Sequence, residues 1–386
     1  MKTKALQIVD SYSVGNFHEM FNSAMLVVCS HQVERIVYRA DARSQDCVLS
    51  HVITNGYEEE LSKVEKKTLF VVRKESTVGL LCRTMVSAFQ NARYLFVKRK
   101  EPIIYMHNDA FSIYLLNFFN LILKRPIWIV CHGELELLIS NPCWYKPSFL
   151  YKQLFAFFYK YIPISRHLHF IVLGESILIN LKKVLPAGRE NLFVAMEHPY
   201  FFKKEHVYKK VLPRKLVIGT IGSMNVFKGY YRLLDLAKML EIPIQAHEIT
   251  LVVTRFENVK VNRQGLIQCV CKHNGLLPRD EYEQFINGLD YVLFLYASNS
   301  YKFIASGAIF DTISFGKPII ALRNDYFVSI FEQCGDIGYL CENIEDMACL
   351  ILKLLDEPDM TAYDSFLQNM EKAKLLYAPE YVKIDL

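Results

Sequence analysis

A chain of 386 residues is longer than the roughly 250 to 300 residues at which a single hydrophobic core stops growing, so two domains are expected. Its composition of 52% hydrophobic and 22% charged residues, without a biased tract, excludes a disordered chain, a collagen and a small disulfide scaffold. The net charge of +5 is uneven: residues 1–200 hold 24 Lys and Arg against 17 Asp and Glu, whereas residues 201–386 hold 21 against 23.

The first half alternates segments typical of strands with segments typical of helices, which predicts a parallel sheet with crossover helices. The predicted strands, in chain order, are 5–10, 35–38, 68–72, 102–106, 127–131, 169–173 and 192–195. The predicted helices between them include 77–95, 111–123, 149–161 and 176–184. An N-terminal Rossmann-like domain is therefore expected over residues 1–200.

A polar and basic stretch at 201–213 predicts a linker, after which the alternating pattern begins again. The second half is expected to form a C-terminal Rossmann-like domain over 214–386, its last helices packing back on the first domain. Its predicted strands are 216–221, 249–253, 266–270, 291–295 and 318–322, and its predicted helices are 228–240, 279–287, 307–315 and those from 344 onward. Two doubly wound α/β domains facing across a cleft are expected, with ligands outside the carboxyl ends of the strands.

The lack of a recognisable export signal and the pattern of the cysteines favour a cytoplasmic protein. The first residues lack the apolar core of a signal peptide, and the longest apolar segment, 110–123, is 14 residues long, whereas a membrane-spanning helix needs about 20. The ten Cys form no CxxC pair and no zinc-like cluster, as expected in a reducing compartment. The basic first half suits an anionic membrane surface, and the absence of nucleic-acid-binding patterns argues against nucleic acid as a partner.

The segment 218–237 (IGTIGSMNVFKGYYRLLDLA) contains a strand that ends near Gly222 and Ser223, followed by a loop that leads to Lys228 and Gly229 at a helix start. A helix start combined with a lysine favours a diphosphate. Together with 274–295 and 306–322 (SGAIFDTISFGKPIIAL), this segment resembles the donor-binding domain of GT-B glycosyltransferases, closest to the retaining family-4 (glycosyl transferases group 1) type.

The resemblance implies further donor-binding residues in 306–322. Ser306 and Gly307 precede a helix start whose N–H groups would hold the diphosphate from the other side. Asp311 stands where the family carries the second glutamate of a pair, and its carboxylate would accept two hydrogen bonds from the ribose diol. The first glutamate of that pair would fall at Phe303, and Ser223 replaces a common basic residue, so retaining and inverting chemistry both stay open.

Three strand ends in the first half carry the remaining candidates. Gly15 and Asn16 follow the first strand, where GT-B enzymes have a loop near donor and acceptor. Asp109 follows the strand 102–106, and His132 and Glu134 follow the strand 127–131. The resemblance implies that His132 approaches the transferred sugar, while an inverting reaction would need Glu134 or Asp109 as general base.

The segment 146–162 (KPSFLYKQLFAFFYKYI) is dense in Phe and Tyr and carries three lysines. This composition suits a helix in a lipid headgroup layer, and the alternative is an aromatic core helix. We favour the membrane interpretation because the same half carries the excess positive charge, which would make the protein peripheral on the inner face of the membrane.

The resemblance, together with the basic and aromatic first half, implies a hexosyltransferase-type enzyme that moves a sugar from a nucleotide diphosphate donor to a glycan or lipid-linked acceptor in surface polysaccharide synthesis. The acceptor would bind to the first domain and the donor to the second. No metal and no cofactor are expected, since GT-B enzymes generally need none. Two alternatives remain: a nucleotide-sugar epimerase of the same superfold, and a non-catalytic two-domain binding protein with a decayed site.

Overall fold

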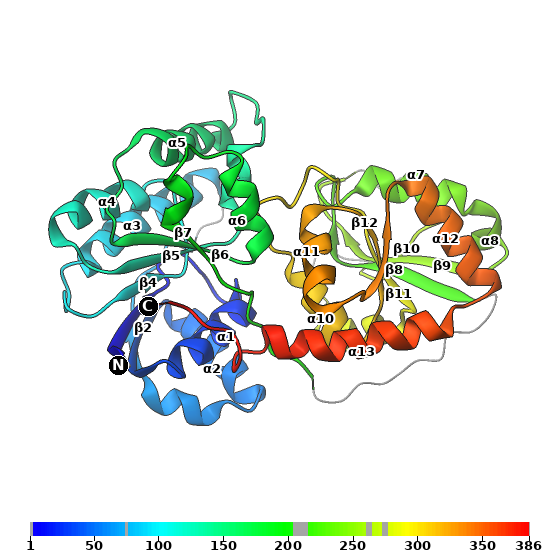
Figure 1. The fold of residues 1–386 in the computed structure, drawn as a ribbon, viewed down its shortest axis with the longest axis horizontal. Coiled ribbons are helices and arrows are strands. Elements are labelled where there is room, and N and C mark those ends of the chain that lie inside the picture. The colour runs from blue at the N-terminus through cyan, green and yellow to red at the C-terminus, as the bar shows by residue number, and fades with distance from the viewer. Residues whose placement is uncertain (1–2, 74–75, 204–214, 260–264, 272–276, 386) are drawn as a thin grey trace. The chain divides into compact units, whose positions relative to one another are not determined.

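The computed structural model describes residues 3–73, 76–203, 215–259, 265–271 and 277–385. It divides into two compact units (Figure 1). Unit 1 comprises Met1–Phe201, Phe303–Ala305 and Tyr377–Leu386, and unit 2 comprises Phe202–Lys302 and Ser306–Leu376. Most of the predicted linker, 204–213, lies outside the described residues.

Unit 1 contains a seven-stranded parallel sheet in the order β3-β2-β1-β4-β5-β6-β7. The strands are β1 (Thr3–Val9), β2 (Val33–Ala40), β3 (Val64–Thr68), β4 (Ile103–Tyr105), β5 (Ile127–Cys131), β6 (Leu168–Val172) and β7 (Phe193–Ala195). The helices are α1 (Glu19–Ser30), α2 (Ala42–Thr54), α3 (Thr77–Tyr94), α4 (Ser112–Leu123), α5 (Pro147–Tyr161) and α6 (Glu175–Lys182), with short 3-10 helices η1 (Glu58–Lys63), η2 (Glu134–Leu138) and η3 (Arg189–Leu192).

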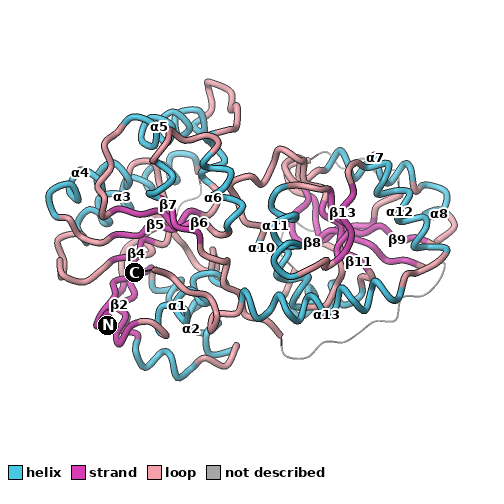
Figure 2. The backbone as a smooth tube through the Cα atoms, in the orientation of Figure 1, coloured by secondary structure: helices cyan, strands magenta, loops and turns pink. Residues whose placement is uncertain are grey.

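Helices cover both faces of this sheet, as Figure 2 shows. The inner strand β5 is buried along its whole length, because a parallel strand between two helical layers exposes neither face. One core cluster packs α4, α5 and α6 against the sheet, including Ile113, Phe158 and Ile177. A second cluster packs α1 and α2 against the opposite face, including Met25 and Val48.

Unit 2 contains a six-stranded parallel sheet in the order β10-β9-β8-β11-β12-β13. The strands are β8 (Leu216–Met224), β9 (Ile249–Phe256), β10 (Gln268–Cys269), β11 (Tyr291–Phe294), β12 (Ile319–Leu322) and β13 (Gly338–Cys341). The helices are α7 (Tyr230–Met239), α8 (Glu241–Gln245), α9 (Arg279–Gly288), α10 (Gly307–Ser314), α11 (Asp325–Cys334), α12 (Ile344–Asp356) and α13 (Met360–Tyr377).

Both sheets are doubly wound, which confirms the predicted fold class of two Rossmann-like units. In each sheet the first strand of the unit lies in the middle, and the chain winds outward from it in both directions. The winding direction reverses between β1 and β4 in unit 1, and between β8 and β11 in unit 2. Ligands of doubly wound sheets bind outside the carboxyl ends of the strands at this reversal. Within the described residues, no helix is both long and apolar enough to cross a bilayer.

Candidate active site

The turn after β8 packs directly on the end of β11, at the reversal of the unit 2 sheet. Gly229 has a φ of +91°, and a Cβ atom built on it would lie 2.2 Å from the carbonyl oxygen of Leu295. Only glycine fits this backbone approach and this conformation. The packing therefore fixes the turn that carries Lys228 at the switch point of the sheet.

The backbone of this turn satisfies its own hydrogen bonds. The N–H groups of Lys228 and Tyr230 donate to the carbonyl oxygen of Asn225, each at 3.1 Å, and the N–H of Gly229 donates to the carbonyl of Val226 at 3.2 Å. The side-chain oxygen of Asn225 also accepts from the N–H of Lys228. These amides therefore do not point at a ligand, and the cation of the turn is the Lys228 ammonium.

The Lys228 ammonium lies over Gly222. Its Nζ is 3.3 Å from the place that a Cβ of Gly222 would occupy, and Gly222 has a φ of +71°. A side chain at this position would push the ammonium away. The two residues that the sequence motif joins are thus in contact at the carboxyl end of β8.

Ser223 lies beside a second cation. The Nε of Arg255, on the neighbouring strand β9, donates to the Ser223 hydroxyl, and Arg255 and Ser223 are partners in the strand register. The guanidinium also forms an ion pair with Glu257 at 3.2 Å. Arg255 therefore places a positive group beside Ser223, although Glu257 offsets part of its charge.

Helix α10 begins after β11, the strand next to β8. Ser306 is buried, and its hydroxyl lies 3.1 Å from the hydroxyl of Tyr296. Gly307 is exposed at the first position of the helix. The carboxylate of Asp311, one turn further, accepts a hydrogen bond of 2.9 Å from the hydroxyl of Tyr282. Burial, and next the Asp311 carboxylate, raise the pKa of the Tyr282 hydroxyl, which keeps it a proton donor.

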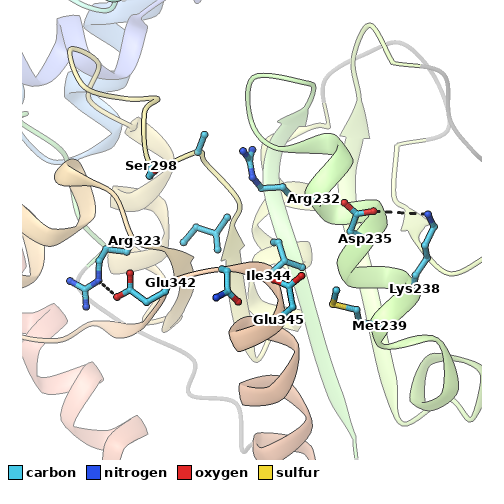
Figure 3. A pocket seen from close by; sticks show the side chains of 12 residues that line it. Arg232, Asp235, Lys238, Met239, Ser298, Arg323, Glu342, Ile344 and Glu345 are labelled. Atoms are coloured by element: carbon cyan, nitrogen blue, oxygen red, sulfur yellow. Dashed lines mark hydrogen bonds and ion pairs between the residues drawn. The ribbon is translucent and has the colours of Figure 1, made fainter.

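A cavity of about 460 Å³ opens at the carboxyl ends of β12 and β13, beside α7 and the start of α12 (Figure 3). Its lining is charged: Arg323 pairs with Glu342 at 2.6 Å, and Lys238 lies 4.0 Å from Asp235. None of the donor-binding residues predicted from the sequence lines it.

The switch point of the unit 1 sheet carries aromatic rings. Tyr12, after β1, stacks on His107, after β4, with ring centroids 3.9 Å apart. The guanidinium of Arg83, from α3, lies 5.5 Å from the centre of the Tyr12 ring. The Nδ1 of His107 is buried and has no hydrogen-bond partner among the described residues. Burial, and next the charge of His132, lower the pKa of His107 to about 3.

His132 lies in the same group of rings. It stacks on His18 with centroids 4.2 Å apart, and the edge of Phe21 meets both His132 and His198. The Nε2 of His132 hydrogen-bonds the carbonyl oxygen of Met106 at 2.9 Å, which fixes the ring. Burial holds the pKa of His132 well below its usual value, and lowers those of His18 and His198 to about 3 and 4.

These imidazoles are therefore neutral near pH 7. A neutral imidazole donates at one nitrogen and accepts at the other, which suits sugar hydroxyls. A histidine with so low a pKa is, however, a weak base near neutral pH.

The two candidate carboxylates of unit 1 both bind backbone amides. Oδ1 of Asp109 accepts from the N–H groups of Phe111 and Ser112, at 3.0 and 2.8 Å, and so caps α4. Oε2 of Glu134 accepts from the N–H groups of His132 and Gly133, at 3.1 and 3.0 Å.

Burial outweighs these hydrogen bonds in setting the pKa of both carboxyls. It raises the pKa of Asp109 to about 6, and it also raises the pKa of Glu134. A pKa near the working pH suits a general base, so Asp109 has the proton affinity that the histidines lack.

Gly15 and Asn16 form the turn between β1 and α1. Gly15 has a φ of +62°, and a Cβ atom there would meet nothing within 4 Å. Asn16 is exposed, and its carbonyl accepts from the N–H of Glu19 at the start of α1. The turn leads directly to His18.

Phe303 is a core residue of unit 1. Its side chain is 1% exposed and belongs to the same cluster as Ile113 and Phe158. Its N–H donates to Oε2 of Glu136 at 2.9 Å, and the neighbouring Ile304 packs where a Cβ of Gly133 would lie. The position of the family's first glutamate is therefore used here for packing.

Sequence reasoning did not single out Tyr12, His18 or Phe21. The available signal was position: Tyr12 and His18 lie in the loop after the first strand, beside the predicted Gly15 and Asn16. Among the described residues, no group of three or more His, Cys, Asp or Glu side chains is arranged to hold a metal ion.

Comparisons with known proteins identify the fold. No protein-family model matches the sequence, and no curated protein matches it. Three solved structures match nearly the whole chain: TarM (TM-score 0.63, 13% identity, 98% of this chain and 97% of TarM), Anabaena HepE with UDP-glucose (0.59, 14%, 98% and 96%), and WaaG, a glycosyltransferase of lipopolysaccharide biosynthesis (0.57, 13%, 97% and 97%). The expected resemblance is thus confirmed at the level of architecture: the chain has the GT-B fold of these proteins.

Proposed function

We propose that this protein is a glycosyltransferase that moves a sugar from a nucleotide diphosphate donor to a glycan or lipid-linked acceptor in surface polysaccharide synthesis. The observation that carries the proposal is the switch point of unit 2, where Gly229 packs on Leu295 and the Lys228 ammonium lies over Gly222. A cation at the carboxyl end of β8 is suited to a diphosphate leaving group. The fold shared with WaaG and with HepE bound to UDP-glucose supports the same function.

The donor residues have distinct roles in this proposal. Lys228 neutralises the charge that develops on the departing diphosphate, and the first-turn amides at Gly307 donate to its oxygens. The carboxylate of Asp311, which Tyr282 orients, accepts hydrogen bonds from the ribose diol. Arg255 supplies a second positive group beside Ser223.

The acceptor residues belong to unit 1. His132 is held by the Met106 carbonyl and presents a neutral ring to the transferred sugar. For an inverting reaction, both carboxylates are candidate bases, because burial raises the pKa of Asp109 to about 6 and also raises the pKa of Glu134. For a retaining reaction neither carboxylate is needed as base. The anomeric configuration of the product, read by NMR, decides between the two.

We also propose that the protein is cytoplasmic and binds to the anionic inner face of a membrane. Support comes from the excess of basic residues in 1–200 and from α5, where Leu150, Phe157 and Tyr161 are exposed beside Lys160. Flotation with anionic vesicles at low and high salt tests this part. Binding that does not weaken at high salt, or no binding, contradicts an electrostatic contribution.

Thermal unfolding in the presence of a panel of nucleotide diphosphate sugars tests the donor site. A donor at 100 times its dissociation constant stabilises the folded state by about 2.7 kcal/mol. Lys228→Met should reduce the shift at a fixed donor concentration, whereas Lys353→Met, which changes an exposed lysine of α12, should keep it. No shift with any donor would favour a binding protein with a decayed site, and an epimerised donor formed without acceptor would favour an epimerase.

Turnover is expected to persist in the presence of a chelator, because Lys228 and the amides at α10 supply the positive charge that a metal would otherwise provide. Loss of transfer on addition of EDTA, restored by a divalent cation, would contradict this part of the proposal.

A further inference from the structure

Three neighbouring helices of unit 1 expose apolar side chains to solvent. On α3 these are Val78, Leu81, Met85 and Phe89, at helical spacing, and on α5 they are Leu150, Phe157 and Tyr161, also at helical spacing. Helix α4 adds Phe118, Leu121 and Ile122. A stripe of this kind normally faces a core, and a soluble surface rarely exposes several of them together. Figure 1 shows the three helices on the same side of the sheet.

A groove of about 450 Å³ opens between these helices. Its walls are Met85 and Phe89 of α3, Phe111 and Tyr114 at the start of α4, and Leu154 and Phe157 of α5. The Tyr114 hydroxyl is the polar group of this lining, and it donates to the Leu154 carbonyl at 2.7 Å. The lining therefore offers no unsatisfied donor to water, and an apolar cavity of this kind favours hydrocarbon.

The charged residues on the helices that form the groove indicate which class of apolar ligand it fits. Helices α3, α4 and α5 contain no Asp and no Glu, but they contain Arg83, Arg93, Lys152 and Lys160. An apolar groove between helices that carry basic and no acidic residues complements a molecule with a hydrocarbon chain and an anionic head.

The groove adjoins the ring group of unit 1. Phe111, in its wall, donates its N–H to the Asp109 carboxylate and contacts the ring of Tyr151, with centroids 6.1 Å apart. Arg83 precedes the wall residue Met85 by two positions on α3, yet its guanidinium lies over Tyr12, which stacks on His107. Phe111 and Arg83 therefore connect the elements that form the groove to the ring group that follows β1 and β4.

We infer that this groove seats the hydrocarbon chain of a lipid-linked acceptor, so that the anionic head of the lipid lies at Arg83 and the acceptor sugar lies at the unit 1 rings. This inference rests on the proposed function and names its acceptor class. Seating the chain in the protein holds the acceptor at one depth and orientation, which a flat membrane contact would not do.

The test is calorimetric titration of the full chain with single-chain anionic lipids, the lysophosphatidylglycerols with 8, 10 and 12 carbons, below their micelle-forming concentrations. One lipid should bind per protein. Since each buried methylene contributes about 0.8 kcal/mol, affinity should rise about fourfold for each added carbon until the groove is full. Several lipids per protein, or no dependence on chain length, would overturn the inference.

Variants distinguish lipid binding in the groove from lipid binding to the surrounding surface. Phe89→Ser removes a wall and should weaken lipid binding at least tenfold, and Ala88→Leu, which places a larger side chain in the groove, should do the same. Ile122→Ser is the matched control, because Ile122 is 74% exposed on α4 and does not line the groove. Equal losses in Phe89→Ser and Ile122→Ser would overturn a specific groove. A dimer in lipid-free protein that Phe89→Ser dissociates would assign the groove to a second copy of the chain, which also overturns it.

The same preparations report on the proposed function separately. Thermal stabilisation by a nucleotide sugar should be unchanged in Phe89→Ser, because Phe89 belongs to unit 1 and the proposed donor residues belong to unit 2. If donors stabilise the protein but no lipid binds, the groove inference fails alone. If lipid binds in the predicted way but no donor stabilises the protein, the transferase proposal fails and the groove remains a lipid-binding site.

Discussion

The two units of this protein share one strand order but place opposite chemistry at the point where the winding reverses. In unit 1 the reversal carries stacked neutral rings, Tyr12 on His107 and His18 on His132. In unit 2 it carries glycines and the Lys228 ammonium. The doubly wound sheet therefore sets only where ligands bind, and the residues after each strand set what binds there. Uncharged rings suit a sugar, whereas a fixed cation suits a diphosphate.

The sharpest difference lies in how tightly each loop is packed, and the same substitution in both units measures it. Gly229→Ala places a Cβ 2.2 Å from the Leu295 carbonyl at a φ of +91°, so strain and steric overlap together should cost about 3 to 4 kcal/mol of unfolding free energy. Gly15→Ala meets no neighbour within 4 Å and should cost about 1 kcal/mol, through its φ of +62° alone. Urea unfolding of both variants is the measurement, and equal losses would remove the distinction.

Lys228→Met tests whether the cation of unit 2 acts in the transition state. Removing one preorganised positive group from a leaving-group site lowers kcat by about 100- to 1000-fold. The rate of sugar transfer at saturating donor is the measurement, with Lys353→Met as the matched control on the same unit. A loss of less than threefold in Lys228→Met would show that another group, such as Arg255, neutralises the diphosphate.

Asp311→Asn should have a smaller effect, confined to donor affinity. An amide keeps one acceptor oxygen but loses the charge, so the KM for the donor should rise about tenfold while kcat stays near its original value. A donor that contains 2′-deoxyribose gives the sharper comparison, because it lacks one of the two hydroxyls that Asp311 would bind. The tenfold effect should shrink with this donor, and Asp364→Asn, an exposed acid of α13, should change neither constant. If Asp311→Asn raised the KM equally for the ribose donor and the 2′-deoxyribose donor, Asp311 would not bind the ribose diol.

The grouping of the candidate residues at the end of β8 was predictable because their motif is local. Gly222, Lys228 and Gly229 lie within eight residues, so one strand, one turn and one helix start bring them together. What the sequence did not reveal is that Asn225 and Val226 take up the amides of that turn, since those hydrogen bonds depend on the conformation of the loop.

The ring group of unit 1 was predictable only in part, because its members come from four strand ends. His132 was identified from the resemblance, but the contacts of His18 with His132 and of Tyr12 with His107 depend on the order of strands in the sheet, which sequence periodicity does not give. Edge strands are similarly hard to predict. The apolar run at 68–72 was expected as a strand, yet β3 is the more polar Val64–Thr68, and only Leu69 continues the ladder, to Ala40. An edge strand has a less buried environment, so hydrophobicity does not mark it.

The smallest expected effect is the dependence of stability on pH that the buried histidines and Asp109 of unit 1 produce. The folded pKa values of His18 and His198, about 3 and 4, lie below the value of about 6.5 in an unfolded chain. Between these values the unfolded chain binds more protons, so stability should fall as the pH drops from about 6.5 towards 4. Asp109 acts in the opposite direction, since its folded pKa of about 6 exceeds the unfolded value, and its contribution is lost as the pH rises through 6.

Two variants separate these contributions in urea unfolding at pH 7.5, 6.5, 5.5 and 4.5. His18→Phe keeps a ring against His132 and Phe17 but cannot bind a proton, so the loss of stability on acidification should become shallower than in the natural chain. Asp109→Asn removes the opposing titration and should make the loss steeper. Parallel curves for all three proteins would mean that these groups titrate alike in the folded and unfolded states, and the neutral rings of unit 1 would then no longer distinguish its switch point from the charged one of unit 2.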